Sequence, residues 1–325
     1  MYKVHLVDGL PNINLQDISL EKKLLADIAE VTSENVKDES ELSDTFYEAD
    51  VIIPWHLLTL SAATIKKLKQ CKGIIRTGVG YDSVDVKTAG EQDIPVFNIP
   101  DYGTQEVADH ALALILNLSR RVNIYLDSVK GGVWDWQAAK PVTRLSNMTL
   151  GIIGYGRIGQ EVAKRAKAFG FNIIFYDPYL SDDFKSKSGS TRVKTLSELL
   201  SMSDIVSLHV PLTDETKYLI SEKELNLMKP DSILVNTSRG PVVESKALVK
   251  ALKQDKLAGV GLDVIENEPQ VPDELKNDER VLITPHAAFY SEQSMHDLRR
   301  KSAEITRAIL LGEDLPEPVN AEFLK

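Results

Sequence analysis

Strand-like runs of β-branched and aliphatic residues alternate with helical patterns along this 325-residue chain. Such alternation is the sequence form of a parallel sheet covered by helices. Four strands in the first hundred residues and six from residue 149 onward predict two doubly wound α/β domains, and the length also predicts two, at about 100–200 residues per domain. The expected strands span residues 3–7, 51–53, 73–76, 95–98, 150–153, 172–176, 205–208, 232–236, 259–263 and 281–283.

Two helical patterns predict how the chain divides into these domains. Apolar residues at helical spacing predict a long, mostly buried helix that begins near Thr104. A last pattern, roughly residues 292–311, follows the second group of strands, and we expect its helix to return to the first domain. One domain would therefore comprise residues 1–99 and 292–325, and the other residues 100–291.

Composition and charge exclude several kinds of partner. A formal net charge of −10 and a pI near 5.2 provide no broad positive surface, so we expect neither nucleic acid nor a membrane as a partner. The single cysteine, Cys71, excludes an internal disulfide framework, and we expect no metal. The N-terminus lacks a signal-peptide pattern, and the longest apolar stretch, 107–118, is shorter than the ~20 residues that span a bilayer. We therefore expect a cytoplasmic protein.

A glycine-rich run is the strongest local signal. Its first glycine would make a tight turn, its second would let the main chain approach a pyrophosphate, and its third would allow a helix to pack closely on the strand. The positive end of the helix dipole would then face the anion. An ordinary glycine turn is the alternative, but the order of strand, turn and helix favours a dinucleotide site. The run consists of Gly154, Tyr155, Gly156, Arg157, Ile158 and Gly159.

Asp177 ends the next expected strand, ~20 residues further on, where such sites place a carboxylate for the adenosine ribose. A carboxylate there would accept hydrogen bonds from both ribose hydroxyls and repel a 2′-phosphate. Pro178 and Tyr179 provide no arginine to bind that phosphate. We therefore expect NAD rather than NADP as the cofactor, with a turn residue before a proline as the alternative reading of Asp177.

Three ionisable residues follow the ends of later expected strands: Arg239, Glu268 and His286. In an open α/β sheet, ligands bind at the carboxyl ends of the strands. Each residue by itself also has a structural explanation, as a surface arginine, a loop glutamate or a capping histidine. Their positions alone therefore do not assign a reaction.

Together with the glycine run, five segments of this chain resemble the D-isomer-specific 2-hydroxyacid dehydrogenases, and the resemblance covers essentially the whole chain. It implies two Rossmann-like domains, with the NAD-binding domain inserted in a flavodoxin-like substrate-binding domain. Three further runs, 166–172, 175–181 and 290–293, are most similar to the branch that contains the C-terminal-binding proteins. The five segments are Arg76–Gly80, Leu208–Thr213, Val235–Gly240, Asp263–Pro269 and Thr284–Ala288.

The resemblance implies an oxidoreductase that interconverts a 2-oxo acid and a D-2-hydroxy acid by hydride transfer with NAD. His286 would be the general acid in reduction and the base in oxidation, a role that suits an imidazole. Glu268 would hydrogen-bond the other ring nitrogen and favour the charged ring. Arg239 would bind the substrate carboxylate with its planar guanidinium.

The resemblance also assigns supporting roles. Main-chain N–H groups at Gly78 and Val79 would complete the carboxylate site, and Arg76 would add a second cation. Asp263 matches the family position that binds the nicotinamide carboxamide. The other positions that would line the cofactor are His209, Val210, Thr237 and Ser238.

A homodimer is implied as well, through the helix from Thr104 and the segment Trp134–Trp136. Two alternative functions stay open: an NAD(H)-sensing scaffold, as in the corepressor role of the C-terminal-binding proteins, and D-3-phosphoglycerate dehydrogenase within the same family. Phe289 stands where the C-terminal-binding proteins carry a tryptophan, so their substrate preference does not transfer to this chain. The sequence leaves the acid unnamed.

Overall fold

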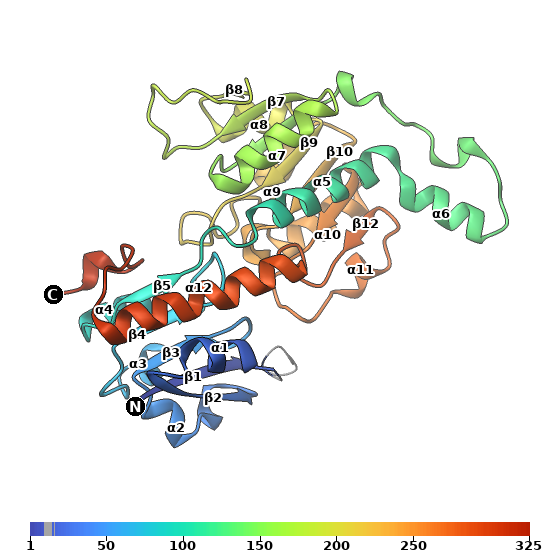
Figure 1. The fold of residues 1–325 in the computed structure, drawn as a ribbon. Coiled ribbons are helices and arrows are strands. Elements are labelled where there is room, and N and C mark those ends of the chain that lie inside the picture. Colours follow the sequence, from blue (N-terminus) through green and yellow to red (C-terminus); the bar gives the residue numbers. More distant parts are fainter. Residues whose placement is uncertain (10–14, 16) are drawn as a thin grey trace. The chain divides into compact units, whose positions relative to one another are not determined.

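All paired strands run parallel, in two separate sheets of five and seven strands. The computed structural model describes residues 1–9, 15 and 17–325 (Figure 1). The first unit consists of Met1–Tyr102 and Ser291–Lys325, and the second unit of Gly103–Tyr290. The expected α/β class with two parallel sheets is confirmed.

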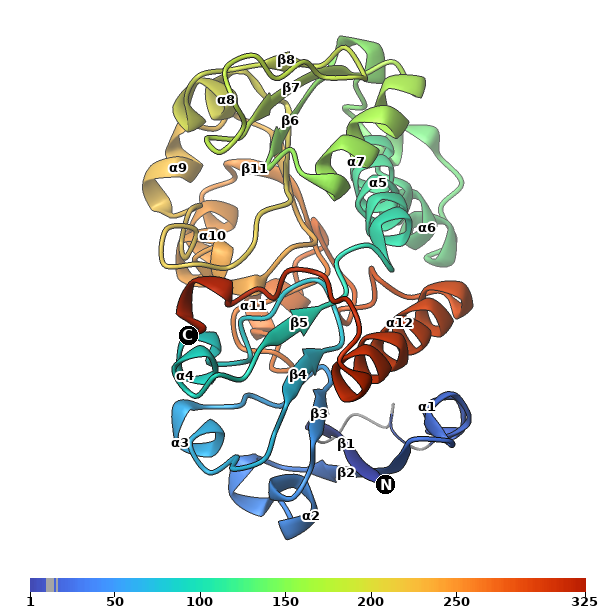
Figure 2. The same ribbon diagram turned by 60° about the vertical axis from the view of Figure 1, so that its left-hand side comes forward.

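The first unit has the strand order β2-β1-β3-β4-β5, which is the flavodoxin-like order (Figure 2). Helix α12 packs in this unit, where its Leu298 and Leu310 share a buried cluster with Val4 of β1. The strands are β1 (Tyr2–Gly9), β2 (Ala29–Val36), β3 (Val51–Pro54), β4 (Gly73–Arg76) and β5 (Val96–Asn98). The helices are α1 (Ser19–Leu25), α2 (Asp44–Tyr47), α3 (Ala62–Ile65), α4 (Val86–Glu91) and α12 (Glu292–Leu311).

Strand β2 is a fifth strand in this unit, where the sequence predicted only four. It lies at the edge of the sheet, where one side of the strand has no neighbour. Only Ala29, Val31 and Val36 of its eight residues are buried, and the others are polar. An edge strand with so few apolar residues lacks the hydrophobic run that identifies a central strand.

The second unit has the strand order β12-β11-β10-β9-β6-β7-β8. The six expected strands are present, with ends that differ by at most two residues, and the two-residue edge strand β8 adds a seventh. The strands are β6 (Thr149–Ile153), β7 (Asn172–Tyr176), β8 (Thr191–Arg192), β9 (Ile205–Leu208), β10 (Ser232–Asn236), β11 (Leu257–Leu262) and β12 (Val281–Ile283). The helices are α5 (Thr104–Arg120), α6 (Val122–Lys130), α7 (Arg157–Ala168), α8 (Leu196–Met202), α9 (Glu222–Leu227), α10 (Ser245–Lys253) and α11 (Asp273–Lys276).

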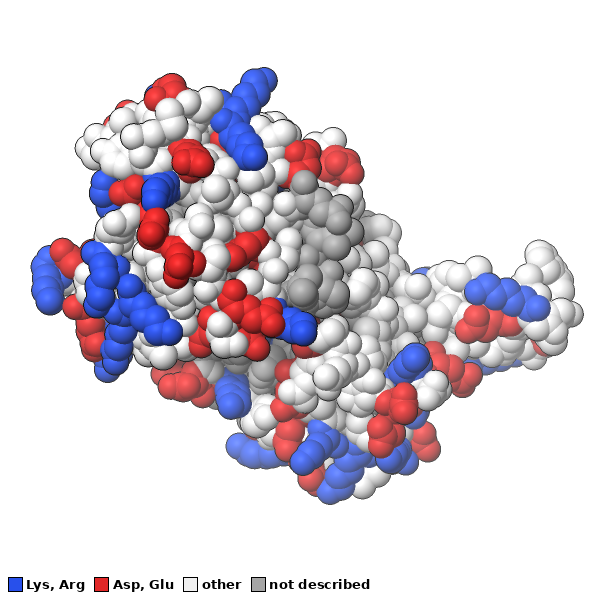
Figure 3. Space-filling view, turned by 90° about the horizontal axis from the view of Figure 1, so that it is seen from below, with Lys and Arg blue, Asp and Glu red and all other residues white. Residues whose placement is uncertain are grey.

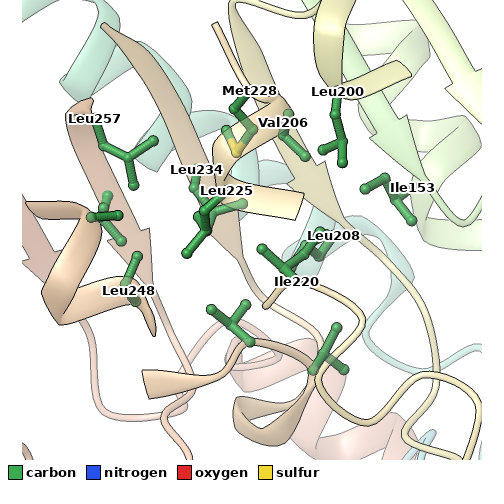
Figure 4. Close-up of a cluster of buried hydrophobic side chains, with 14 of the residues drawn as sticks. Ile153, Leu200, Val206, Leu208, Ile220, Leu225, Met228, Leu234, Leu248 and Leu257 are labelled. Carbon is green, nitrogen blue, oxygen red and sulfur yellow. The ribbon is translucent and has the colours of Figure 1, made fainter. Parts of the chain in front are cut away.

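Alternate residues of the second sheet enter two hydrophobic clusters, one on each face. In β10, Ile233 and Val235 pack with α5 and α7, whereas Leu234 packs with α8, α9 and α10. Figure 4 shows part of the cluster that contains Leu234, in which Leu225 of α9 and Leu248 of α10 lie against the strands. Both faces are covered, so most residues of the central strands are apolar.

The surface carries charges of both signs. On the face drawn in Figure 3, Lys and Arg side chains lie among Asp and Glu side chains. Short 3-10 helices complete the secondary structure at Glu39–Glu41, Trp136–Ala139, Leu145–Asn147, Gly240–Val242 and Ala321–Phe323. None of the helices in the described part of the chain is long and apolar enough to cross a membrane.

Candidate active site

The glycine turn follows β6 at the carboxyl edge of the second sheet. Gly154 has φ +84°, and a Cβ there would collide with the carbonyl oxygen of His209, which follows the neighbouring strand β9. A Cβ on Gly159 would collide with the carbonyl oxygen of Gly154. Helix α7 can therefore pack this close to β6 only because residue 159 is glycine. A Cβ on Gly156 would meet no atom within 4 Å. The main chain at Gly156 is therefore open to a ligand.

Helix α7 begins directly after this opening, with Gly156 as its N-cap and no side chain that caps it. Its first N–H groups have no partner within the helix, and they carry the positive end of a twelve-residue helix dipole. An anion is the group that such an end binds best. The turn and the helix together fit a pyrophosphate.

Tyr155, Arg157 and Ile158 complete the expected run, and Tyr155 has an unexpected place. The residue is 1% exposed, and its ring stacks on that of Phe175 of β7 with ring centroids 3.8 Å apart. Its hydroxyl lies within hydrogen-bond distance of the hydroxyls of Ser186, Ser188 and Ser190. The side chain therefore belongs to the core, which leaves the main chain of Tyr155 to face the turn.

Asp177 follows β7 and is held by main-chain donors. Its Oδ2 accepts from the N–H of Tyr155 at 2.8 Å, and its Oδ1 accepts from the N–H of Tyr179 at 3.0 Å. Because each carboxylate oxygen can accept two hydrogen bonds, both oxygens keep capacity for a ligand. The glycine turn and this carboxylate are thus one hydrogen-bonded unit.

At the carboxyl edge of the second sheet, Nδ1 of His209 and Oγ1 of Thr237 are buried and lack a hydrogen-bond partner among the described residues. Buried polar atoms are rarely left unpaired, so a bound molecule or water is expected to satisfy them. Burial lowers the pKa of His209 to about 4, so its ring is neutral at pH 7. Its Nε2 lies 2.8 Å from Oγ of Ser207. Val210 follows His209 and lies beside Gly154. These residues fit a dinucleotide.

The carboxyl end of β12 carries the expected histidine. Nδ1 of His286 lies 2.7 Å from Oε2 of Glu268, and Oε1 of Glu268 accepts from the N–H of Ile265 at 3.0 Å. A carboxylate only accepts, so Nδ1 carries a proton in either charge state of the ring, and a neutral ring has Nε2 as its acceptor. The two side chains are 21% and 26% exposed, which leaves the pair accessible to a small molecule.

Asp263 holds the turn that bears this histidine. Its carboxylate accepts from Oγ1 of Thr284 at 2.6 Å and from the N–H groups of Ala287 and Ala288 at 2.9 Å each. Its main-chain oxygen accepts from the N–H of His286 at 2.8 Å. Its carboxylate thus already has three protein donors, in addition to any contact with the nicotinamide carboxamide that the resemblance implies.

Arg239 follows β10 in a turn that Asn236 organises. Nδ2 of the fully buried Asn236 donates to the carbonyl oxygen of Arg239 at 2.8 Å, and Oδ1 accepts from the N–H and the hydroxyl of Ser238. Nη1 of Arg239 donates to the carbonyl oxygen of Ser238 at 2.9 Å. Gly240 is in contact with Ile265, the residue bonded to Glu268. Asn236 was not among the residues expected from the sequence, although asparagine side chains commonly hydrogen-bond the main chain two residues on.

Arg239, Glu268 and His286 therefore follow three neighbouring strands, β10, β11 and β12, of one sheet edge. Residues 112–288, which lie inside the second unit, match the family described as D-isomer specific 2-hydroxyacid dehydrogenase, NAD binding domain. The chain belongs to this family. Its second unit is the NAD-binding domain.

Known relatives agree with this assignment. The chain is 42% identical over 283 residues to a glyoxylate reductase of Korarchaeum cryptofilum, covering 86% of this chain and 85% of the relative. It is 37% identical over 298 residues to a D-3-phosphoglycerate dehydrogenase of Methanocaldococcus jannaschii, covering 92% of this chain but 57% of the relative. The structure of a D-lactate dehydrogenase from Aquifex aeolicus complexed with NAD and lactic acid has a TM-score of 0.85 at 31% identity, covering 95% and 96% of the two chains.

The other residues expected to bind substrate lie in the first unit of this family member, at the end of β4. Arg76 is 6% exposed, and its Nη1 donates to the carbonyl oxygen of Thr77 at 2.7 Å. A Cβ on Gly78 would collide with the guanidinium of Arg76, so glycine lets the cation lie against the main chain. The carbonyl oxygen of Val79 accepts from Nδ2 of Asn98 at 2.6 Å. The described part of the chain has no group of three or more His, Cys, Asp or Glu residues that could hold a metal ion.

Proposed function

We propose that the chain is an NAD-dependent D-2-hydroxyacid dehydrogenase that interconverts a 2-oxo acid and a D-2-hydroxy acid. The observation that carries this proposal is the His286–Glu268 pair, 2.7 Å apart at the carboxyl edge of the NAD-binding domain. Open α/β sheets bind their ligands at this edge. The family, whose relatives are named dehydrogenases and reductases, supports the same reaction class.

Reduction of a 2-oxo acid adds a hydride to the carbonyl carbon and a proton to the carbonyl oxygen. When bound, NADH supplies the hydride. Because Glu268 holds the proton on Nδ1, Nε2 of the charged His286 ring is the atom that donates the proton to the substrate. In the oxidation direction, Nε2 of the neutral ring accepts the proton of the hydroxyl group.

Arg239 is the group we assign to the substrate carboxylate. Its guanidinium is oriented by the hydrogen bond to Ser238, so part of the entropy of ordering this side chain is lost before substrate binds. A planar guanidinium can donate two parallel hydrogen bonds to a carboxylate, which also sets the orientation of the bound acid. In the first unit, Arg76 and the main-chain N–H groups of Gly78 and Val79 are the further substrate contacts we propose.

A steady-state scan of 2-oxo acids with NADH tests the proposal. Glyoxylate and pyruvate are the first substrates to compare, and D-3-phosphoglycerate with NAD provides the oxidation arm. D-3-phosphoglycerate oxidation is the second candidate function, supported by the 37% identity to the Methanocaldococcus jannaschii enzyme. Absence of turnover with every acid, together with tight NADH binding, would instead favour an NAD(H)-sensing scaffold. The run Tyr290–Gln293 resembles the C-terminal-binding-protein branch, in which such a role is known.

Asp177 is expected to select NAD over NADP. Wild-type protein should use NADH with a kcat/KM at least ~10²-fold above that for NADPH, since a 2′-phosphate would lie against this carboxylate. Asp177→Ser should lower kcat/KM for NADH by about tenfold, because charged hydrogen bonds to the ribose are lost, and should raise the value for NADPH. Asp182→Ser, at an exposed position of the same loop, is the control. Equal kcat/KM for the two cofactors in the wild type would contradict the assignment.

We propose that two copies of the chain associate through the segment formed by α6 and residues 131–136. No residue of α6 is buried, and Figure 1 shows this segment extending away from the seven-stranded sheet. Trp134 and Trp136 are 90% and 69% exposed, and Leu126 and Val129 are half exposed. Exposed apolar surface of this extent marks a site of association. A second apolar surface would complement this segment, and we assign that surface to another copy of the chain.

Sedimentation velocity at micromolar concentration is expected to show a dimer. Trp134→Lys with Trp136→Lys should shift the protein to a monomer, because two charges would enter the apolar contact. Phe169→Lys, at a half-exposed aromatic residue after α7, should leave the dimer intact. A wild-type monomer would refute the proposal.

A further inference from the structure

His110 of α5 is hydrogen-bonded to the turn that carries His286. Nε2 of His110 lies 2.9 Å from Oγ1 of Thr284, and this hydroxyl lies 2.6 Å from Oδ1 of Asp263. Nε2 of His110 also lies 3.6 Å from the same carboxylate oxygen. The side chain of His110 is 26% exposed and that of Asp263 is 1% exposed. A partly exposed helix residue thus reaches a buried carboxylate.

The direction of these hydrogen bonds follows from the atoms. The carboxylate of Asp263 only accepts, so the single proton of the Thr284 hydroxyl is donated to it. The hydroxyl must then accept from His110, which assigns a proton to Nε2 of His110. The two donors, Nε2 of His110 and the Thr284 hydroxyl, thus have one acceptor each. Thr284 therefore links His110 to the Asp263 carboxylate, which the N–H groups of Ala287 and Ala288 also bind.

Asp263 in turn determines the conformation of the turn at His286. Its carboxylate binds the two N–H groups that follow His286, and its main-chain oxygen binds the N–H of His286 itself. His286 has φ +51°, a left-handed conformation that a residue with a Cβ keeps only where its surroundings enforce it. Oε2 of Glu268 holds the ring at Nδ1. The ring direction is thus set by the Asp263 contacts and by Glu268 together.

We propose that His110 is a positioning residue for His286, acting through Thr284 and Asp263. This inference rests on the proposed function, in which His286 transfers the proton. Of these four side chains, only His286 transfers the proton in the proposed reaction. Loss of the donor Nε2 of His110 would loosen the turn that orients the ring of His286. Small misplacements of a catalytic group lower the reaction rate strongly. Binding of NADH would be little affected.

Three variants separate positioning from packing. His110→Leu removes the donor, whereas His110→Gln places an amide N–H near the position of Nε2. We expect His110→Leu to lower kcat by about tenfold with little change in the Kd for NADH, and His110→Gln to restore most of the loss. Asp109→Asn, at a neighbouring exposed residue that pairs with Arg165, is the control and should keep the wild-type kcat. Equal loss in His110→Leu and His110→Gln would overturn the proposal.

A double-mutant cycle tests the route through the hydroxyl. Thr284→Val removes the hydroxyl and keeps the shape, and it should lower kcat about as much as His110→Leu. If His110 acts through Thr284, the double variant should resemble Thr284→Val alone. Multiplied losses, about a hundredfold in the double variant, would show that the two residues act independently and would refute the inference.

Nuclear magnetic resonance of ¹⁵N-histidine-labelled protein gives a readout that does not depend on turnover. In the wild type we expect a protonated Nε2 on His110. His110→Leu should shift the ring nitrogens of His286, and His110→Gln should leave them near their wild-type positions. If no acid is turned over but these shifts appear, the proposed function fails and the positioning network stands. Unchanged His286 resonances in His110→Leu would refute the network itself.

Discussion

Replacing His286 with alanine is expected to lower kcat for reduction of the preferred 2-oxo acid by about 10³-fold, within the range that a general acid contributes. The variant lacks the imidazole, paired with Glu268, that we assign as the proton donor. The glycine turn and Asp177 are untouched, so the Kd for NADH should stay close to the wild-type value. Steady-state kinetics and titration of NADH fluorescence measure the two quantities.

His296→Ala is the matched control, since this histidine is exposed on α12. It should keep the wild-type kcat. If His286→Ala turned over at the wild-type rate, the acid would be another group. If instead its NADH binding were lost as well, His286 would have a structural role in the cofactor site.

Arg239→Lys is expected to lower kcat/KM for the 2-oxo acid by about 10²-fold although the charge is kept. An ammonium is a point charge that cannot form two parallel bonds to a carboxylate, and lysine lacks the hydrogen bond by which the guanidinium is held on Ser238. The substrate would bind more weakly and in more orientations, so KM should rise and kcat should fall. The Kd for NADH should change little.

Arg144→Lys, at an exposed arginine of the same unit, serves as the control and should leave both constants unchanged. A wild-type kcat/KM in Arg239→Lys would mean either that only the positive charge at residue 239 matters or that the substrate carboxylate is bound elsewhere. Arg76→Lys distinguishes these two outcomes, because a carboxylate bound at Arg76 would make that variant the impaired one.

Much of the fold could be predicted because the residues that decide it are local. In the second unit, six expected strands are present, since a strand buried on both faces is a continuous apolar run between turn residues. The edge strand β2 escaped detection because only three of its eight residues are buried. Strand β8 has two residues, too few to form a pattern.

The site could be predicted only in part, for the same reason. Gly154, Gly156 and Gly159 identify themselves by spacing, because a main chain that must pass close to another atom excludes a side chain. The buried ring of Tyr155 was not foreseen, since its contacts with Ser186, Ser188 and Ser190 come from a loop more than thirty residues away. Asn236 was missed because it lies at the end of a strand and stabilises a turn from there.

By itself, the sequence determined the α/β class, the family and the NAD-binding turn, because periodic burial and glycine spacing depend on neighbouring residues. Only the tertiary structure decided how His286 is held. Thr284 is 21 residues from Asp263 and 174 residues from His110, and no local pattern records such contacts. Hydrogen bonds between distant side chains exist only once the sheet and α5 have packed together, and the proposed positioning of His286 rests on these bonds.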